Sequence, residues 1–188
     1  MSYTERRRFL WILFLVGVAL IAIVANATTL ARLKLEDLAL ESTAVARLRC
    51  LGARSQWEQG EIWTETQFEV VQREKGSLPE MVTVRLLGGR VGHLWSRVEE
   101  VPQFRPGEEV YLFLWSSEGQ AYSVLGWSQG TFRIARDAQT GLETVTQDSA
   151  ARPIFEPQTR GFRHGGIRNM PVALFRARLH WAMKRENP

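Results

Sequence analysis

Residues 126–130 carry the one pattern in the chain that is typical of covalent catalysis. They read GWSQG, a G-x-S-x-G sequence, and Asp148 followed by His164 or His180 completes the chain order of an esterase triad. In esterases the serine lies where a strand turns sharply into a helix. Here the residues after the motif alternate like a strand, and the chain lacks repeated strand and helix units. We therefore interpret the motif as the corner of a β-hairpin and disfavour Ser128 as a catalytic residue, with a serine hydrolase kept as an alternative function.

A glycine-rich loop is the second candidate. Residues 88–95 read GGRVGHLW, which has neither the spacing of a dinucleotide-binding motif nor the Lys-Ser/Thr ending of a phosphate loop. The glycines indicate a bend or bulge with positive φ. The remaining hypothesis is a rim that contacts a ligand or partner through Arg90, His93 and Trp95, together with Trp127 from the hairpin corner.

The residue types that bind metals are sparse. His93, His164 and His180 lie far apart in the sequence, no HExxH pattern is present, and Cys50 is the single cysteine. We predict no metal and no cofactor. Cys50 cannot form an intramolecular disulfide, and its surroundings predict a small core residue on a strand.

The charge of the chain does not favour nucleic acid as a partner. The formal net charge is +4, and it falls to +2 when Arg6, Arg7, Arg8 and Glu5 are removed with the leader described below. Arginine and lysine gather near the C-terminus. This clustering indicates a solvent-exposed face of the C-terminal helix and of the loop before it, and the alternative is a site for a polyanion. The basic residues concerned are Arg160, Arg163, Arg168, Arg176, Arg178, Lys184 and Arg185.

The tryptophans offer a further route to a ligand. Exposed aromatic rings on a small barrel would suit stacking against sugars or single-stranded nucleic acid. Large aromatic residues more often fill small β cores, so we predict that most of them are buried. Outside the leader they are Trp57, Trp63, Trp95, Trp115, Trp127 and Trp181.

Short alternating runs predict an antiparallel β domain over residues 44–147. Residues 43–54 and 61–75 alternate on either side of a polar, Gly-terminated segment and predict a long hairpin, and 81–87 predicts a third strand. The run 109–115 is apolar on both alternating faces, so we expect it to be covered on both sides at the centre of the sheet.

The segments around this domain have other patterns. Residues 28–43 contain apolar positions at helical spacing and predict a short leading helix. Residues 148–168 read as an extended surface segment, and 169–188 as an amphipathic C-terminal helix with Asn169 as its cap. The apolar stripe of that helix needs a partner, and the Tyr111/Phe113/Trp115 face of the central strand is the obvious candidate.

The amino terminus has the order of a secretory signal peptide, residues 1–27. Arg6-Arg7-Arg8 precedes the apolar run Phe9–Val24, and Ala25-Asn26-Ala27 forms a cleavage site after Ala27. The arginines also resemble a twin-arginine export signal, so both export routes stay open. We predict a periplasmic or extracellular protein, with an inner-membrane protein anchored through residues 9–24 as the alternative.

The domain resembles a group of uncharacterised exported bacterial proteins with small β domains. The resemblance covers roughly residues 35–147 and is most specific at Pro106-Gly107-Glu108-Glu109 and at Gln129-Gly130-Thr131-Phe132. More distantly, the order of strands is similar to OB-type barrels of the netrin and metalloproteinase-inhibitor kind. Those inhibitors act through a disulfide-bonded cysteine at the mature amino terminus. Thr28 stands at that position here, so the resemblance implies the barrel and not the inhibition.

The sequence therefore predicts a mainly β protein, a small antiparallel OB-like barrel of five or six strands with a short leading helix and a C-terminal helix. We expect an exported non-catalytic binding or interaction module, whose partner is an unknown protein or envelope ligand. The two alternatives are the hydrolase and a membrane-tethered envelope protein whose amino-terminal helix is not cleaved.

Overall fold

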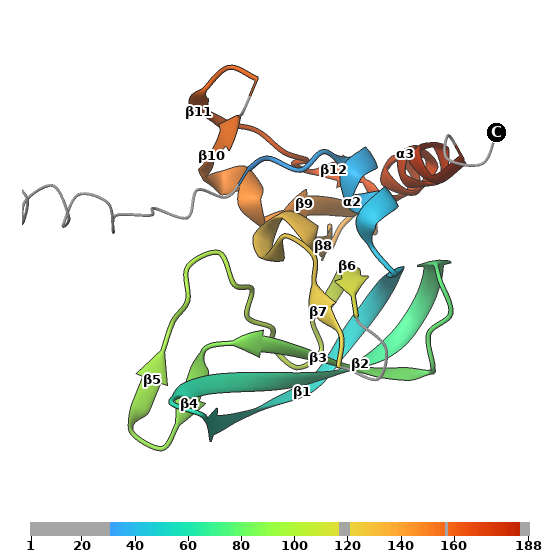
Figure 1. Cartoon of the computed structure of the whole chain (residues 1–188). Coiled ribbons are helices and arrows are strands. Elements are labelled where there is room, and N and C mark those ends of the chain that lie inside the picture. Colours follow the sequence, from blue (N-terminus) through green and yellow to red (C-terminus); the bar gives the residue numbers. More distant parts are fainter. Residues whose placement is uncertain (1–30, 117–120, 157, 185–188) are drawn as a thin grey trace, which may run out of the picture. The chain divides into compact units, whose positions relative to one another are not determined.

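The computed structural model describes residues 31–116, 121–156 and 158–184 (Figure 1). The chain divides into two units, Met1–Leu30 and Ala31–Pro188, and all described residues belong to the second. The predicted signal peptide, its cleavage site after Ala27 and the apolar run therefore lie outside the described residues. None of the described helices is long and apolar enough to cross a membrane.

The fold is mainly β, as predicted. The strands are β1 (Ala44–Glu58), β2 (Glu61–Lys75), β3 (Met81–Leu87), β4 (Gly89–Val91), β5 (Leu94–Ser96), β6 (Glu109–Trp115), β7 (Ser123–Val124), β8 (Thr131–Arg136), β9 (Glu143–Gln147), β10 (Pro153–Glu156), β11 (Gly161–His164) and β12 (Met170–Pro171). The helices are α2 (Leu35–Glu41) and α3 (Val172–Lys184), with 3₁₀ turns η1 (Trp127–Gly130) and η2 (Asp148–Ala151). The short leading helix and the C-terminal helix are both confirmed.

The main sheet is antiparallel and has the order β12-β9-β8-β6-β1-β2-β3, with β7 paired to β6. The long β1–β2 hairpin is confirmed. It closes through Gln59 and Gly60, which both have positive φ (49° and 90°), the backbone that a two-residue hairpin turn requires. Strand β6 lies in the middle of this order, so the prediction of a central strand is also confirmed.

Both faces of β6 are buried, because successive side chains of a strand point to opposite faces. Val110, Leu112 and Leu114 enter a first core together with residues of β1, β2 and β3. Cys50 is part of this core, as predicted. Tyr111 and Phe113 enter a second core on the opposite face.

The two helices cover the second core (Figure 1). Leu35, Leu38 and Ala39 of α2 pack there, and α3 contributes Phe175, Leu179 and Ala182. The Phe175 ring centroid lies 5.1 Å from that of Tyr111 and 5.0 Å from that of Phe132. The predicted partner of α3 is therefore confirmed for Tyr111 and Phe113, whereas Trp115 at the end of β6 is exposed.

The described sheet is not closed into a barrel. Strand β3 lies at one end of the sheet order and β12 at the other. One isolated parallel bridge, between Val84 and Tyr122, joins β3 to the residue before β7, and the Arg85 amide donates to the Tyr122 carbonyl at 2.8 Å. The first core therefore lies inside a curved sheet in which this bridge joins the end strand β3 to the segment that pairs with β6, and not to the other end strand.

Two predicted segments differ from the structure. Residues 148–168 are not simply extended, because η2 and the β10–β11 hairpin lie within them. The C-terminal helix begins at Val172 rather than at 169. Asn169 has a φ of 46° and exchanges hydrogen bonds with Thr146, while Met170 and Pro171 pair with β9. These pairings hold Asn169 in a turn, so it does not cap the helix.

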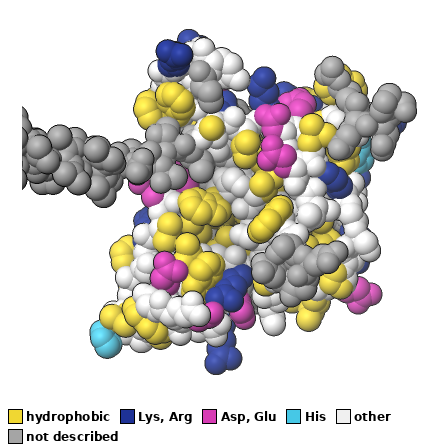
Figure 2. All heavy atoms as spheres, viewed as in Figure 1, with side chains coloured by type: hydrophobic (Ala, Val, Ile, Leu, Met, Phe, Trp, Pro, Cys, Tyr) yellow, Lys and Arg dark blue, Asp and Glu magenta, His cyan; other side chains and the backbone are white. Residues whose placement is uncertain are grey.

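The prediction that most tryptophans are buried is wrong. Apolar side chains reach the surface at several places in Figure 2, and four of the six tryptophans are about half exposed or more. They are Trp57, Trp95, Trp115 and Trp181. Trp63 and Trp127 are partly buried, Trp63 beneath the guanidinium of Arg85. Smaller aliphatic residues and phenylalanine fill the two cores instead.

Candidate ligand-binding site

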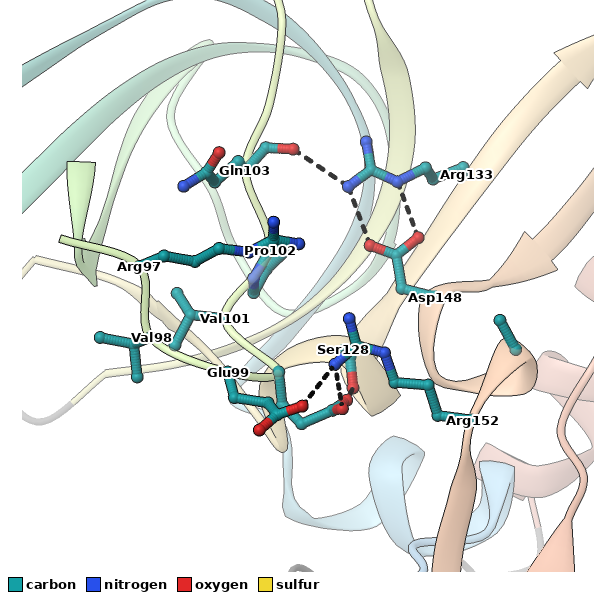
Figure 3. A pocket seen from close by; sticks show the side chains of 12 residues that line it. Arg97, Val98, Glu99, Val101, Pro102, Gln103, Ser128, Arg133, Asp148 and Arg152 are labelled. Atoms are coloured by element: carbon teal, nitrogen blue, oxygen red, sulfur yellow. Dashed lines mark hydrogen bonds and ion pairs between the residues drawn. The ribbon is translucent and has the colours of Figure 1, made fainter. Parts of the chain in front are cut away.

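Two cavities lie on either side of the segment 97–104. The first, called the rim cavity here, has a volume of about 320 Å³ and opens between the β1–β2 hairpin and the β4–β5 hairpin. The second, called the charged cavity, has a volume of about 600 Å³ and opens between the segment 97–103, η1 and η2 (Figure 3). Pro102 and Gln103 line both cavities.

The floor of the rim cavity is a continuation of the inner sheet face beyond the first core. A register shift in β1 between Cys50 and Gly52 brings Ala53 and Ser55 onto the same face as Cys50. They pair with Thr66 and Thr64 of β2, respectively. All four side chains are small, so the sheet is left with open space above it where larger residues would have extended the core.

The hydroxyl groups on this floor form a directed chain of hydrogen bonds. Thr64 donates to the Gly88 carbonyl at 2.5 Å, so the Ser55 hydroxyl, 2.8 Å from that of Thr64, must act as the donor to it. The Arg90 amide donates to Ser55 at 3.3 Å. Both hydroxyl protons are used, and each oxygen keeps one lone pair. The floor therefore offers acceptors to hydrogen-bond donors of a ligand.

Gly88 and Gly89 bring the loop against this floor. Their φ angles are +92° and +131°, and a Cβ on Gly89 would lie 2.2 Å from the Thr64 hydroxyl oxygen and 2.4 Å from that of Ser55. The interpretation of these glycines as a bend with positive φ is confirmed. The absence of a side chain at Gly89 allows the hydroxyl chain to form.

The walls combine aromatic rings and one cation. Trp95 is 65% exposed and stands directly across the small β4–β5 hairpin from Arg90. Arg90 donates from Nε to the Gly92 carbonyl at 3.0 Å, and its terminal nitrogens bond no described group. Phe104 closes the cavity from the other side and packs edge-on against Phe68 of the first core at 5.0 Å.

The structure thus brings together two of the four predicted rim residues. Arg90 and Trp95 line the rim cavity. His93 lies in the exposed turn between β4 and β5, outside the lining of the cavity. Trp127 lies at the start of η1 and packs against the first core, and it lines neither cavity.

The charged cavity is lined by paired charges. Arg133 binds Asp148 through two hydrogen bonds, from Nε at 2.7 Å and from Nη2 at 2.8 Å, and its Nη1 pairs with Glu108. Burial raises the pKa of Asp148, although Arg133 acts in the opposite direction. Figure 3 shows Arg133, Asp148 and Arg152 on one side of the cavity and Arg97 and Val98 on the other. Each buried carboxylate here has an arginine partner.

Ser128 lies in the charged cavity, but its surroundings differ from those of a catalytic serine. Its hydroxyl donates to a carboxylate oxygen of Glu100, and Arg152 binds the other oxygen at 2.7 Å. The motif lies in η1 and leads directly into β8 of an antiparallel sheet. Strands β7 and β8 on either side of it both pair with β6 and not with each other, so the predicted corner of a β-hairpin is wrong. Gly130 is required by the turn, because a Cβ there would lie 2.1 Å from the Leu125 carbonyl oxygen.

The residues of the esterase order are not brought together. Asp148 lines the same cavity as Ser128, where it is held by Arg133. His180 lies on α3 and bonds Glu74 at 2.6 Å, and His164 lies on β11 opposite Pro153. Among the described residues that line the charged cavity there is no histidine.

Sequence reasoning did not find the floor of the rim cavity. Alternation correctly placed Thr64 and Thr66 with Phe68 on one face of the hairpin. The signal that could have found the floor is the small size of three inward-facing residues at the end of the long hairpin. Ser55, Thr64 and Thr66 are too small and too polar to extend a core. Phe104 gave no signal, because its place above the sheet depends on the path of the whole segment 97–104.

Comparisons with protein-family models, curated proteins and solved structures found no match to this chain. In the part of the chain that the structure describes, no three His, Cys, Asp or Glu side chains gather as a metal site.

Proposed function

We propose that the protein is an exported, non-catalytic binding module with an OB-like, incompletely closed barrel, and that it binds a small ligand in the rim cavity. The observation that supports this most is the composition of that cavity, in which a floor of hydroxyl acceptors lies beneath Trp95, Phe104 and Arg90. Concave sites with apolar walls and a few placed polar groups are typical of small-molecule binding.

The chemistry of the cavity indicates the class of ligand. An exposed indole stacks on flat rings or on the apolar face of a sugar. The lone pairs of Ser55 and Thr64 accept from ligand hydroxyl or amide groups, and the free nitrogens of Arg90 bind an oxygen acceptor. We therefore propose a ring-containing ligand that carries several hydroxyl or amide groups.

Ligand-observed saturation-transfer NMR with a panel of methyl glycosides and aromatic amides tests this proposal. We expect binding by the wild-type chain, a loss of about 5- to 100-fold in Trp95→Ala because ring stacking is removed, and no binding in Ala53→Phe. Ala53 is exposed on the cavity floor, so a larger side chain there fills the cavity without entering the core. Trp57→Ala is the matched control, because Trp57 is also exposed but lines neither cavity. Binding that survives Ala53→Phe would contradict the proposal.

The hydrolase is the weaker alternative, because the Ser128 hydroxyl is bound to Glu100 rather than to a histidine. A fluorophosphonate probe decides between the two. We expect no labelling of Ser128, and labelling that disappears in Ser128→Ala would favour the enzyme.

Export and membrane attachment are tested separately. Amino-terminal sequencing of the protein purified from cells should give Thr28 if the signal peptide is cleaved. An intact amino terminus in the membrane fraction would favour the tethered alternative, with residues 9–24 as the anchor.

A further inference from the structure

We propose that the β10–β11 hairpin is a contact site for the surface of a membrane that carries anionic lipid headgroups. This inference concerns a different part of the molecule from the rim cavity. It is carried by the way in which the first described residues attach to the hairpin and by the side chains that the hairpin exposes.

The start of the folded unit is fixed to both strands of the hairpin. Ala31 forms an isolated parallel bridge with Phe155 of β10, and the Arg32 amide donates to the Phe155 carbonyl at 3.0 Å. The Arg32 guanidinium donates to the Arg163 carbonyl of β11 at 2.5 Å. The described chain therefore begins at this hairpin.

The apolar run of the leader ends at Val24, seven residues before Ala31. A fully extended chain covers at most about 3.6 Å per residue, so no more than about 25 Å of chain joins the two. While the apolar run is held in a membrane, during export or as a retained anchor, this length of chain limits the distance between Val24 and Ala31, which is bridged to Phe155 of the hairpin. Any affinity of the hairpin for the membrane surface then acts at a high effective concentration.

The side chains of the hairpin suit such a surface. Phe162 is 66% exposed, the highest value among the large apolar residues of the described chain, and its ring packs against Phe155 at 5.6 Å. Arg160 lies two residues before Phe162 in the sequence and Arg163 directly after it, both are exposed, and neither guanidinium bonds a described group. Glu156 is the one acidic residue among the described residues of the hairpin. Figure 2 shows basic and apolar side chains together at the hairpin, at the top of the view.

An exposed aromatic ring with arginines close to it in the sequence is a combination that enters the headgroup region of a bilayer, where the ring is partly dehydrated and the cations meet anionic lipids. Three of the other basic residues near the C-terminus are already engaged. Arg176 pairs with Glu74, Arg178 lies 4.0 Å from Glu36, and Arg168 donates to the Ala150 carbonyl. Arg160 and Arg163 lie beside an exposed aromatic ring, so we place the polyanion site considered for this region at the hairpin.

Vesicle flotation tests the proposal with a chain that begins at Thr28, which lacks the apolar run but contains both cores of the second unit. Vesicles of phosphatidylcholine alone are compared with vesicles containing about one third phosphatidylglycerol. We expect binding to the anionic vesicles at 50 mM salt, little binding at 500 mM salt, and little binding to phosphatidylcholine. Each arginine near such a surface contributes about fivefold in affinity.

Two variants locate the contact. At 50 mM salt, Arg160→Glu with Arg163→Glu should lower binding at least 25-fold, and Phe162→Ser should lower it severalfold. Arg54→Glu with Arg105→Glu makes the same charge change at exposed positions outside the hairpin and should have a much smaller effect. Circular dichroism confirms that each variant is folded.

Equal binding to both kinds of vesicle, no binding to either, or equal loss in the two double variants would overturn the proposal. Ala53→Phe, which fills the rim cavity, should leave vesicle binding unchanged. A failure of the ligand proposal and a failure of the membrane proposal can therefore be told apart.

Discussion

Arg47 shows how single side chains hold the curved sheet together. Its Nη1 and Nη2 atoms each donate to Glu143 of β9 at 2.8 Å, and its Nε donates to Glu109 of β6 at 2.6 Å. Strands β1 and β9 are not neighbours, because β6 and β8 lie between them. The arginine is largely buried, so its planar, bidentate contacts act in a medium where charge pairs are stronger than at the surface.

This network should make the free energy of unfolding depend on pH in the acidic range. The hydrogen bonds from Arg47, followed by those from Arg136, lower the pKa of Glu143 to about 2 from a usual value near 4.5, against the effect of burial. A carboxylate whose pKa is lower in the folded state stabilises the fold above pH 4.5, and this contribution is lost as the pH falls toward 2. After allowance for solvent screening, we expect Glu143 to contribute about 1–2 kcal/mol at pH 6.

Urea unfolding of the wild type and of Glu143→Gln measures this effect. The difference in the free energy of unfolding between them should be largest at pH 6 and should shrink as the pH falls toward 2. Glu61→Gln, at the exposed start of β2, is the control and should not change the pH profile. A constant difference between wild type and Glu143→Gln over this range would show that Glu143 does not stabilise the fold through its charge.

At the residue scale, the sequence predicted which residues lie in a core better than it predicted which residues line a cavity. The prediction that Cys50 is a core residue on a strand is confirmed. The sequence could not show that Arg90 and Trp95 line the rim cavity and that Trp127 does not. The lining of this cavity depends on segments that are far apart in the chain. The G-x-S-x-G motif was more informative, because the strand pattern after it argued against a nucleophile turn, and η1 indeed leads into β8.

At the scale of elements, α3 depends on Phe175 for its position. The helix has no acidic residue in its first turn, and its buried contacts come from one narrow stripe. Phe175 contacts aromatic rings of two different strands, Tyr111 of β6 and Phe132 of β8. Such ring pairs stabilise packing beyond the buried area alone.

Phe175→Ala should therefore destabilise the protein by about 3–5 kcal/mol, through lost burial and the cavity that remains. Leu174→Ala is the matched control, because Leu174 is the preceding residue of the same helix and is 56% exposed. It should change the stability by less than about 0.5 kcal/mol. Equal effects of the two substitutions in thermal or urea unfolding would show that α3 is not held by its apolar stripe.

Regular elements were predictable and irregular ones were not. Long alternating runs identified β1, β2 and β3, because a half-buried strand repeats every two residues, and a run that is apolar on both faces identified β6. The β4–β5 and β10–β11 hairpins have strands of three or four residues, which are too short to show a period. The register shift in β1 cannot be seen in the alternation of the sequence either, although it decides which side chains face the rim cavity.

At the scale of the whole folded unit, two cores share one sheet. The first core lies within the curve of β1, β2, β3 and β6, and the second lies between the sheet and the helices. Strands β1 and β6 contribute to both, since their successive side chains point alternately into one and the other. Loss of either core would leave one face of the shared strands without cover.

The two cores should therefore unfold together, although each has its own set of residues. Leu112 and Phe113 are adjacent on β6 and fully buried in opposite cores. Leu112→Ala should cost about 2–5 kcal/mol and Phe113→Ala about 3–5 kcal/mol, and both should lower the midpoint of one common transition. Tryptophan fluorescence comes from all the tryptophans and should change most at the partly buried Trp63 and Trp127. Far-ultraviolet circular dichroism reports on the sheet and helices, so the two curves should coincide in the wild type and in each variant. If Phe113→Ala produced a separate early loss of helix while the fluorescence transition stayed in place, the second core would be a dispensable layer rather than half of one cooperative fold.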